Sequence, residues 1–468
     1  MKDKIKYNNG RQLRTEDYLQ ENTLETEDTV EGPSILVVSE LNEVNTKPLN
    51  NEILERILSR DNMNMAYKRV KANKGAGGID GMTVNELLPF LKENGNQIKE
   101  SIRKREYNPK AVRRVEIPKP DGSKRKLGIP TVVDRVIQQA VAQELSRIYE
   151  PIFSERSYGF RPGRSCHDAI QKVEEIVNRG YTWVVDIDLE KFFDTVNHDL
   201  LISIIRRTIN EDKVVSLIRK YLQAGVLENG LFRKTEKGTP QGGNISPILS
   251  NIMLNELDQE LERRGLEFVR YADDLEIFAK SEKAAKRVLE SITRYIETKL
   301  RLKVNRDKSK IDRPWKTKYL GFGFFRKDGK IKIRVHEKSV KRLKDKIREI
   351  TRRRKAKTMD QRYKELKQLL AGWYNYFKLA ELKRVAKEID GWIRRRIRMC
   401  YWKQWKKSWT KYTNLKKLGI PSREAWLSAK SDKSYWRMAQ TPIINRALTN
   451  KVLRGQGFIG LTDLMEVY

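Results

Sequence analysis

The hydrophobic and polar positions of residues 113–130 alternate as they do in a β-hairpin. Each arm carries apolar residues at every second position, and the letters PKPDG between the arms are typical of a turn. In the next segment, residues 131–150, apolar residues recur at helical spacing from Val132 to Leu145. This stretch of the chain therefore predicts a hairpin that leads into a helix.

The same reasoning predicts further strands and helices downstream. The expected elements are a strand that turns into a helix at 183–199, a Gly/Pro loop before a long helix at 238–261, a strand, tight turn and strand at 268–280, a helix at 281–301, and a strand at 318–326. From about residue 335 the pattern is helical and rich in Arg and Lys. The predicted fold class is α+β up to about residue 325 and mostly α after it.

Helical spacing also opens an ordered region near residue 50. The glycine-rich loop NKGAGGIDG at 73–81 lies between helical segments and does not follow a strand. It therefore lacks the context of a nucleotide-binding glycine loop, although its backbone amides could still approach a phosphate backbone.

The charge of the chain points to a polyanionic partner. The formal net charge is +35, from 97 Lys and Arg against 62 Asp and Glu. Nucleic acid is the favoured partner. An anionic membrane is the rival, but no apolar run approaches membrane-spanning length and no basic amphipathic anchor is evident. We expect no membrane association.

Two further features of composition concern location and the N-terminal region. The chain has only two cysteines and its start lacks the apolar core of a secretory signal, which predicts a reducing, cytoplasmic setting. Residues 15–46 contain nine acidic residues and no Lys or Arg. We expect residues 1–50 to form an acidic, disordered leader, with a short strand at 35–38 as an option.

The fragment FVRYADDLEIFAK at 268–280 carries candidate chemistry. Asp273 and Asp274 are adjacent carboxylates at the predicted turn, and such pairs suit a divalent metal ion. Asp188, at the end of the predicted strand TWVVDID, is the candidate third carboxylate, and Asp186 would share its face if the strand continued that far. Asp-Asp pairs at turns are also common as simple solvated residues, so the pair alone does not settle the matter.

The order of several longer motifs resembles one family. DIDLEKFFD, GTPQGGNISP and YADD occur in the order seen in reverse transcriptases, and RRVEIPKPDGSKRKLGIPTVVDRVIQQA, SYGFRPGRSCHDAI, LRLKVNRDKSKI and KYLGFGF resemble blocks of the group II intron-encoded members. The resemblance covers roughly residues 52–425. It implies a right-hand polymerase with fingers and palm, followed by a helical thumb and maturase region.

The resemblance assigns the catalytic carboxylates. Asp188, Asp273 and Asp274 match the residues of the palm that hold two Mg²⁺ ions, together with the backbone of Leu189. Asp186 does not match, because the family's Asp stands five residues before an aromatic, here Phe193.

The resemblance also assigns a nucleotide-binding set, in which Phe193 favours deoxynucleotides by clashing with a ribose 2′-hydroxyl. The full set is Lys119, Arg125, Phe193, Gln241 and Lys308. The competing interpretations are a merely charged surface hairpin for the two basic residues of the fingers and core packing for Phe193. The neighbouring Phe192 is expected in the core.

Glu276 departs from the family pattern, which has an apolar residue at this place. Alternation puts it on the face opposite Leu275 and Ile277, so we expect it to point to solvent or to pair with Arg270. A fourth acid near the metals could also alter ion affinity.

The C-terminal part carries aromatic residues interleaved with basic ones. Residues 391–423 contain eleven Lys and Arg and no acid, and seven of the nine tryptophans follow residue 335. Such a surface suits phosphates and unpaired bases, although tryptophans at helical spacing are more often core. We expect Trp and Met mostly inside, and an RNA-binding set of Arg394, Arg395, Arg398, Lys403, Lys406 and Lys407 outside.

The expected organisation is a leader at 1–50, an N-terminal extension at 51–110, fingers and palm at 111–325, a thumb and maturase domain at 326–425 and a basic segment at 426–468. With three histidines and no C-x-x-C pair, the chain lacks ligands for the zinc-bearing His–Asn–His endonuclease of many relatives.

The resemblance implies an RNA-directed DNA polymerase that binds a group II intron RNA, assists its splicing and copies it into cDNA during intron mobility. The implied partners are the intron RNA, an RNA template with a DNA or RNA primer, dNTPs and a DNA target site. Two alternatives stay open: a related cellular reverse transcriptase acting in repair or defence, and a splicing cofactor without polymerase activity. The sequence does not predict the oligomeric state.

Overall fold

A computed structural model describes residues 52–118, 122, 124–228, 231–233, 235, 237–238 and 242–467. The acidic leader, the optional strand at 35–38, Lys119 and Gln241 lie outside the described residues. The chain divides into two compact units, and each is described by itself. The first unit comprises Met1–Ser165 and Val185–Ile311, and the second comprises Cys166–Val184 and Asp312–Tyr468. The domain boundaries expected from the sequence stay predictions.

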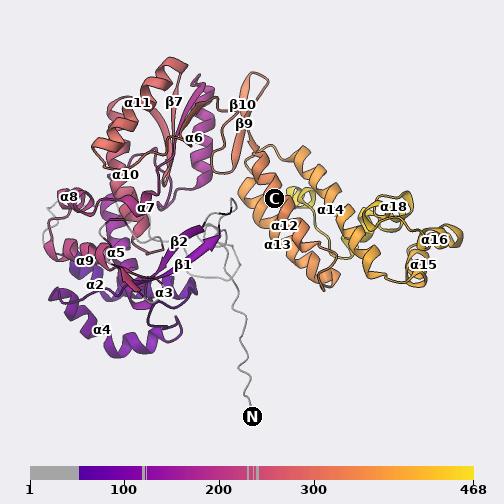
Figure 1. Cartoon of the computed structure of the whole chain (residues 1–468), viewed down its shortest axis with the longest axis horizontal. Coiled ribbons are helices and arrows are strands. Elements are labelled where there is room, and N and C mark those ends of the chain that lie inside the picture. The colour runs from indigo at the N-terminus through magenta and orange to yellow at the C-terminus, as the bar shows by residue number, and fades with distance from the viewer. Residues whose placement is uncertain are drawn as a thin grey trace, which may run out of the picture. The chain divides into compact units, whose positions relative to one another are not determined.

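Helix α5 is buried along most of its length and packs against α2, α3 and α10. Helix α3 packs along α5, and α2 contacts both (Figure 1). The helices are α2 (Ile53–Leu58), α3 (Arg60–Ala72), α4 (Leu87–Arg103), α5 (Val132–Tyr149), α7 (Phe192–Thr195), α8 (His198–Thr208), α9 (Asp212–Gln223), α10 (Ser246–Arg263) and α11 (Glu282–Thr298). The glycine-rich loop at 73–81 connects α3 and α4, as predicted.

A four-stranded sheet in the first unit has the order β2-β1-β4-β5. Its strands are β1 (Val112–Pro118), β2 (Lys124–Ile129), β4 (Val226–Glu228) and β5 (Leu231–Arg233). Strands β1 and β2 pair antiparallel with Val115 opposite Leu127, which confirms the predicted hairpin. Gly122 in the turn has a φ of 84°, a left-handed conformation that glycine adopts without steric cost.

A second four-stranded sheet has the order β6-β7-β3-β8. Its strands are β3 (Trp183–Ile187), β6 (Glu267–Tyr271), β7 (Asp274–Ala279) and β8 (Lys310–Asp312). Strands β6 and β7 form the predicted strand, tight turn and strand, with Tyr271 opposite Asp274 and only Ala272 and Asp273 between them. Helix α10 packs against β6 and α11 against β7 (Figure 1). Helices therefore support β6 and β7, and the turn that joins these two strands lies at the end of the sheet.

The second unit is mainly helical. Its elements are α6 (Cys166–Asn178), the antiparallel hairpin β9 (Phe322–Lys327) and β10 (Lys330–Val335), α12 (Glu337–Ile350), α13 (Met359–Phe377), α14 (Lys383–Gln404), α15 (Ser408–Lys417), α16 (Ser422–Ala429), α17 (Tyr435–Met438), α18 (Pro442–Ala447), α19 (Asn450–Gly455) and α20 (Leu461–Val467). Helices α12, α13 and α14 pack together, and α15, α16 and α18 form a further cluster (Figure 1). The predicted change to helical structure after residue 335 is confirmed, whereas the strand expected at 318–326 begins only at Phe322.

No helix in the described part of the chain is long and apolar enough to cross a membrane.

The N-terminus of α12 makes the stability of the second unit sensitive to pH. His336 is the N-cap, and its Nδ1 accepts a hydrogen bond of 3.1 Å from the Lys338 amide. Burial, followed by the charges of Lys318, Lys338 and Arg334, lowers the pKa of His336 below its ordinary 6.5. As the pH falls below 6.5, the unfolded chain gains this proton first, so the folded state loses stability until the folded pKa is reached.

We expect acidification from pH 7.5 to 5 to weaken this cap, and a helix N-cap contributes about 1 kcal/mol. His336→Asn keeps an N-cap acceptor that does not titrate, so its urea-unfolding free energy should fall less than that of the wild type over this range. His336→Ala, which lacks the cap at every pH, is the matched control. Equal pH dependence in the wild type and His336→Asn would contradict the role of His336.

Candidate active site

The end of β3 is held by the segment 303–309. The Asp188 amide donates to Ser309 Oγ at 3.0 Å, and the Asp188 carbonyl accepts from the Asn305 amide at 2.8 Å. The Glu190 amide donates to the Lys303 carbonyl at 2.8 Å. These bonds fix the backbone on both sides of Leu189. None of them uses the Leu189 carbonyl, which remains a candidate metal ligand. The sequence did not single out Ser309.

Asp273 lies in the two-residue turn between β6 and β7, where it is exposed and Ala272 beside it is buried. Ala272 before it has a φ of 57°, which matches the positive φ of the turns that join tightly twisted strands. Desolvation by the surrounding protein raises the pKa of Asp273, the charge of Asp188 raises it further, and the charge of Arg125 opposes the shift. The structure thus brings Asp188, Asp273 and Arg125 close enough to interact electrostatically.

In the hairpin β1–β2, Arg125 lies on the opposite face from its two basic neighbours, which both have acidic partners. Lys124 Nζ is 2.6 Å from Glu116, and Lys126 Nζ is 3.1 Å from Glu228. Because side chains alternate along a strand, these two lysines share the face opposite to that of Arg125. Acidic partners therefore offset the charge of that face, while the guanidinium of Arg125 acts on Asp273.

The other candidate nucleotide-binding residues are placed as follows. Lys308 Nζ lies 3.9 Å from Asp188 Oδ2, on the segment that holds the end of β3. Phe192 is buried, as expected, and the half-buried Phe193 meets it edge to face with ring centroids 5.3 Å apart. Asp274 begins β7 beside Asp273. Lys119 and Gln241 lie outside the described residues, so their place in the site stays a prediction.

The carboxylates fit a metal that the substrate helps to bind. Within the described ranges, no three His, Cys, Asp or Glu side chains converge as a complete cage. Mg²⁺ is often bound by one or two carboxylates and by substrate phosphates, so a complete cage is not required. Asp188 and Asp273 both offer hard oxygen donors, and their negative charges repel each other. A bound divalent cation would offset this repulsion.

Glu276 does not point to solvent, and this expectation was wrong. The side chain is 1% exposed, and neither carboxylate oxygen has a hydrogen-bond partner among the described residues. Arg270 is bonded to Asp258 on α10 instead. Strand β7 is buried on both faces after Asp274, so alternation did not place Glu276 in water. Burial, followed by the negative charges of Asp186 and Asp274, raises the pKa of Glu276 well above its usual range.

A buried carboxyl without a partner weakens the fold. We expect Glu276→Leu to raise the free energy of unfolding at pH 7.5 by about 2 kcal/mol, because the variant no longer buries an uncompensated polar group. Urea unfolding measures the change. The control is Glu267→Leu on β6, since Glu267 is bonded to Arg156 at 2.5 Å and its loss should destabilise the protein. Destabilisation by Glu276→Leu would show that this carboxyl contributes to the fold.

The RNA-binding set predicted on α14 is partly engaged within the second unit. The guanidinium carbon of Arg395 lies 3.7 Å from the Trp436 ring centroid. Arg398 Nε donates to the Leu448 carbonyl at 3.0 Å, and burial lowers the pKa of Arg398. Lys403 lies over the Tyr435 ring, Arg394 is half-buried, and Lys406 and Lys407 are exposed. Contact with RNA stays a prediction for all six.

The aromatic residues of this region divide between core and surface. Trp402 is 1% exposed and Met399 is buried, as expected, whereas Trp409 is 67% exposed. Trp409 contacts Tyr412, and Lys430 lies over the ring of Trp426. The second unit therefore presents an exposed aromatic and basic surface on α15 and α16.

Comparisons with known proteins agree with this arrangement. Residues 117–324 match the family model described as reverse transcriptase (RNA-dependent DNA polymerase), and residues 340–419 match the group II intron, maturase-specific domain. The chain is 37% identical over 280 residues to Protein YkfC of Escherichia coli, a match that covers 51% of this chain and 74% of YkfC.

A second curated relative is the group II intron-encoded protein LtrA of Lactococcus lactis subsp. cremoris. It is 37% identical over 234 residues, which cover 50% of this chain and 39% of LtrA. Among solved structures, a chain of a partial Cas6-RT-Cas1–Cas2 complex is 25% identical with a TM-score of 0.35, covering 53% of this chain and 43% of that one.

Members of the reverse transcriptase family use divalent metal ions and act on nucleic acids, which suits both the carboxylates and the positive charge. The polymerase and maturase matches occur in one chain and in this order, and the aligned region spans most of YkfC. The chain belongs to the family of group II intron reverse transcriptases and maturases.

Proposed function

We propose that this protein binds a group II intron RNA, assists its splicing and copies it into cDNA with two Mg²⁺ ions at Asp188, Asp273 and Asp274. The observation that supports this most is the approach of Asp188 and Asp273, from the end of β3 and the β6–β7 turn, with Arg125 and Lys308 beside them. Carboxylates that bind metal and cations that bind phosphate are the two requirements of nucleotidyl transfer.

In the proposed reaction, the primer 3′-oxygen attacks the α-phosphate of a dNTP and pyrophosphate leaves. Bound Mg²⁺ would activate the 3′-hydroxyl and offset the charge that develops on the phosphates. Asp188, Asp273 and Asp274, with the Leu189 carbonyl, would hold the two metal ions. Arg125, Lys308 and Lys119 bind the triphosphate, and Gln241 and Phe193 contact the nucleotide.

We propose the remaining partners from the basic surface of the second unit and from the relatives. Intron RNA is proposed to bind the basic set Arg394, Arg395, Arg398, Lys403, Lys406 and Lys407. A DNA target site is the second proposed partner and provides the primer strand. The maturase-specific match favours this function over a cellular reverse transcriptase in repair or defence. Cys166 and Cys400 are free and buried, which suits a reducing compartment, so we place the protein in the cytoplasm.

Primer extension by the purified full chain tests the enzyme. With an RNA template, a DNA primer and dNTPs, we expect extension that requires Mg²⁺ and stops on adding EDTA. In the same preparation, a group II intron RNA should splice faster at low Mg²⁺ with the protein than without it. Absence of extension would contradict the polymerase function, and extension without faster splicing would contradict the maturase function.

A further inference from the structure

A fully buried arginine lies three residues before Asp273. Arg270 on β6 is 1% exposed, and its guanidinium donates hydrogen bonds to three residues. Nε donates to Asp258 Oδ1 at 2.7 Å, and a second nitrogen donates to the other oxygen of Asp258. The remaining nitrogen donates to Asn251 Oδ1 at 3.0 Å and to the Ala272 carbonyl at 2.8 Å. Arg270 therefore connects α10 directly to the turn that carries Asp273.

The acceptors on α10 are buried as completely as Arg270. Asn251 and Asp258 are both 0% exposed and lie seven residues apart, which places them on the same face of the helix two turns from each other. A buried ion pair is weak evidence of stability, because the cost of desolvating two charges offsets much of their attraction. The bond from Arg270 to the Ala272 carbonyl gives this pair a positional role that an apolar pair would not have.

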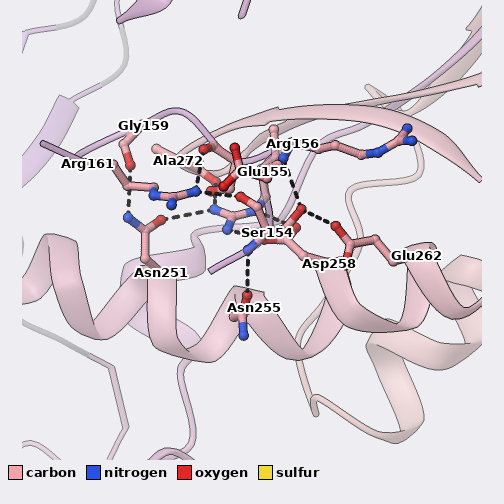
Figure 2. A network of polar contacts seen from close by, with 12 residues as sticks. Ser154, Glu155, Arg156, Gly159, Arg161, Asn251, Asn255, Asp258, Glu262 and Ala272 are labelled. Atoms are coloured by element: carbon pink, nitrogen blue, oxygen red, sulfur yellow. Dashed lines mark hydrogen bonds and ion pairs between the residues drawn. The ribbon is translucent and has the colours of Figure 1, made fainter. Parts of the chain in front are cut away.

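The loop at 154–161 supports the same turn from another direction (Figure 2). The Arg270 carbonyl accepts from the Tyr158 amide at 2.9 Å, and the Arg270 amide donates to the Arg156 carbonyl at 3.0 Å. Asn251 Nδ2 donates to the Gly159 carbonyl at 2.8 Å, so one side chain of α10 contacts both the loop and Arg270.

Gly159 lies directly against the turn. A Cβ built on Gly159 would overlap the Ala272 amide nitrogen and lie 3.0 Å from the Ala272 Cα. Both groups are backbone, so no flexible side chain can move aside. Gly159 and Arg270 thus contact Ala272 from the amide side and the carbonyl side of the residue that precedes Asp273.

The turn has little freedom between these contacts. Ala272 is held in a left-handed conformation that costs a non-glycine residue free energy and persists only where the surroundings determine it. Metal-binding groups must be held within about 0.5 Å of their productive positions. A conformation fixed at Ala272 fixes the Cα position and direction of the next residue, Asp273.

We propose that Arg270 is a positioning residue for catalysis, which with Asp258, Asn251 and Gly159 holds the Ala272–Asp273 turn in its metal-binding geometry. This inference rests on the proposed function, because it deepens the role of Asp273. Arg270 touches neither substrate nor metal, and it acts through the Ala272 carbonyl.

The test separates positioning from stability by a pair of variants. Arg270→Met leaves Asp258 buried without its cation and should lower the melting temperature. Arg270→Met/Asp258→Leu removes both charges and should recover most of that loss, because apolar residues replace a buried ion pair at little cost. The double variant still lacks the bond to the Ala272 carbonyl, so we expect its kcat for primer extension to be reduced about 10-fold or more.

Three readouts accompany kcat. In the double variant, the Mg²⁺ concentration for half-maximal extension should rise several-fold, the dNTP KM should change less than kcat, and the backbone amides of 271–275 should exchange hydrogen faster. Gly159→Ala, which moves the turn from its other side, should give the same changes without altering any charge. The matched control is Arg219→Met/Asp199→Leu, which removes an exposed ion pair between α8 and α9 and should change none of these readouts.

A double variant with wild-type melting temperature, kcat, Mg²⁺ dependence and hydrogen exchange would overturn the positioning role. Hydrogen exchange at the turn does not depend on activity. If the wild type fails to extend primers, the proposed function fails, and unchanged exchange in the double variant would separately show that Arg270 does not hold the turn.

Discussion

Asp273→Asn is expected to reduce primer extension by about 1,000-fold, because a metal-binding carboxylate supplies several kcal/mol of transition-state stabilisation. The amide keeps the size of the side chain but loses the negative charge that a divalent cation requires. Asp273 lies where Asp188 and Arg125 both influence its carboxyl, so the substitution changes the charge at the centre of the site. Single-turnover extension on an RNA template measures the effect.

Binding of RNA should survive this substitution. Affinity for RNA comes mainly from basic residues on phosphates, and removing a negative charge does not weaken those contacts. Asp199→Asn is the matched control, because Asp199 is a 79% exposed aspartate of the same unit bonded to Arg219 at 2.7 Å. Extension by Asp273→Asn at more than a tenth of the wild-type rate would contradict the assignment of Asp273.

Phe193→Ala is expected to lower the preference for dNTPs over rNTPs by about 10- to 100-fold. Phe193 is half-buried while its neighbour Phe192 fills the core, so the two rings have different surroundings. Under the role proposed for Phe193, loss of its ring removes a steric clash with a ribose 2′-hydroxyl. The ratio of kcat/KM for dNTP and rNTP incorporation measures the change.

Two variants make this prediction specific. Phe193→Tyr keeps the ring and should keep the discrimination against rNTPs. Phe193→Ala should retain dNTP incorporation within a few-fold, since Phe192 still packs in the core. An unchanged ratio of dNTP to rNTP incorporation in a folded Phe193→Ala would mean that Phe193 only packs against Phe192.

The sequence predicted those parts of the fold whose signals are local. The hairpin β1–β2 follows from alternation around a Pro-Asp-Gly turn, and the long helix α10 follows from apolar residues at helical spacing after a Gly/Pro loop. The turn at Ala272 and Asp273 was also predicted, because two β-rich runs flank only a few polar residues. The fold class, α+β followed by mostly α, is confirmed.

The parts that were not predicted depend on which faces the tertiary structure covers. Alternation along β7 identified the residues that share a face with Glu276, but it did not show that this face is buried. The partner of Arg270 was also missed, because Asp258 lies on α10 and no short pattern connects the two. For Arg270 a signal existed, because a lone charge inside the apolar run FVRYA indicates a buried partner.

The predicted nucleotide-binding set shows the same division. Three basic residues lie at 306–310, so the local sequence did not distinguish Lys308 from its neighbours. Only the family resemblance made it a candidate. The bonds from Asp188 to Ser309 and Asn305 place that segment beside the end of β3, and Lys308 lies 3.9 Å from Asp188 as a result. Pairing between segments more than a hundred residues apart is not encoded in local periodicity.

Direct measurement of metal binding tests the central claim, that Asp188 and Asp273 together hold the catalytic divalent ion. Mn²⁺ replaces Mg²⁺ and is counted by electron paramagnetic resonance, with primer, RNA template and a non-hydrolysable dNTP analogue bound to the full chain. We expect Asp188→Asn and Asp273→Asn each to weaken Mn²⁺ binding by about 10-fold or more, and Asp199→Asn to leave it unchanged. Wild-type Mn²⁺ affinity in both Asp188→Asn and Asp273→Asn would contradict the account.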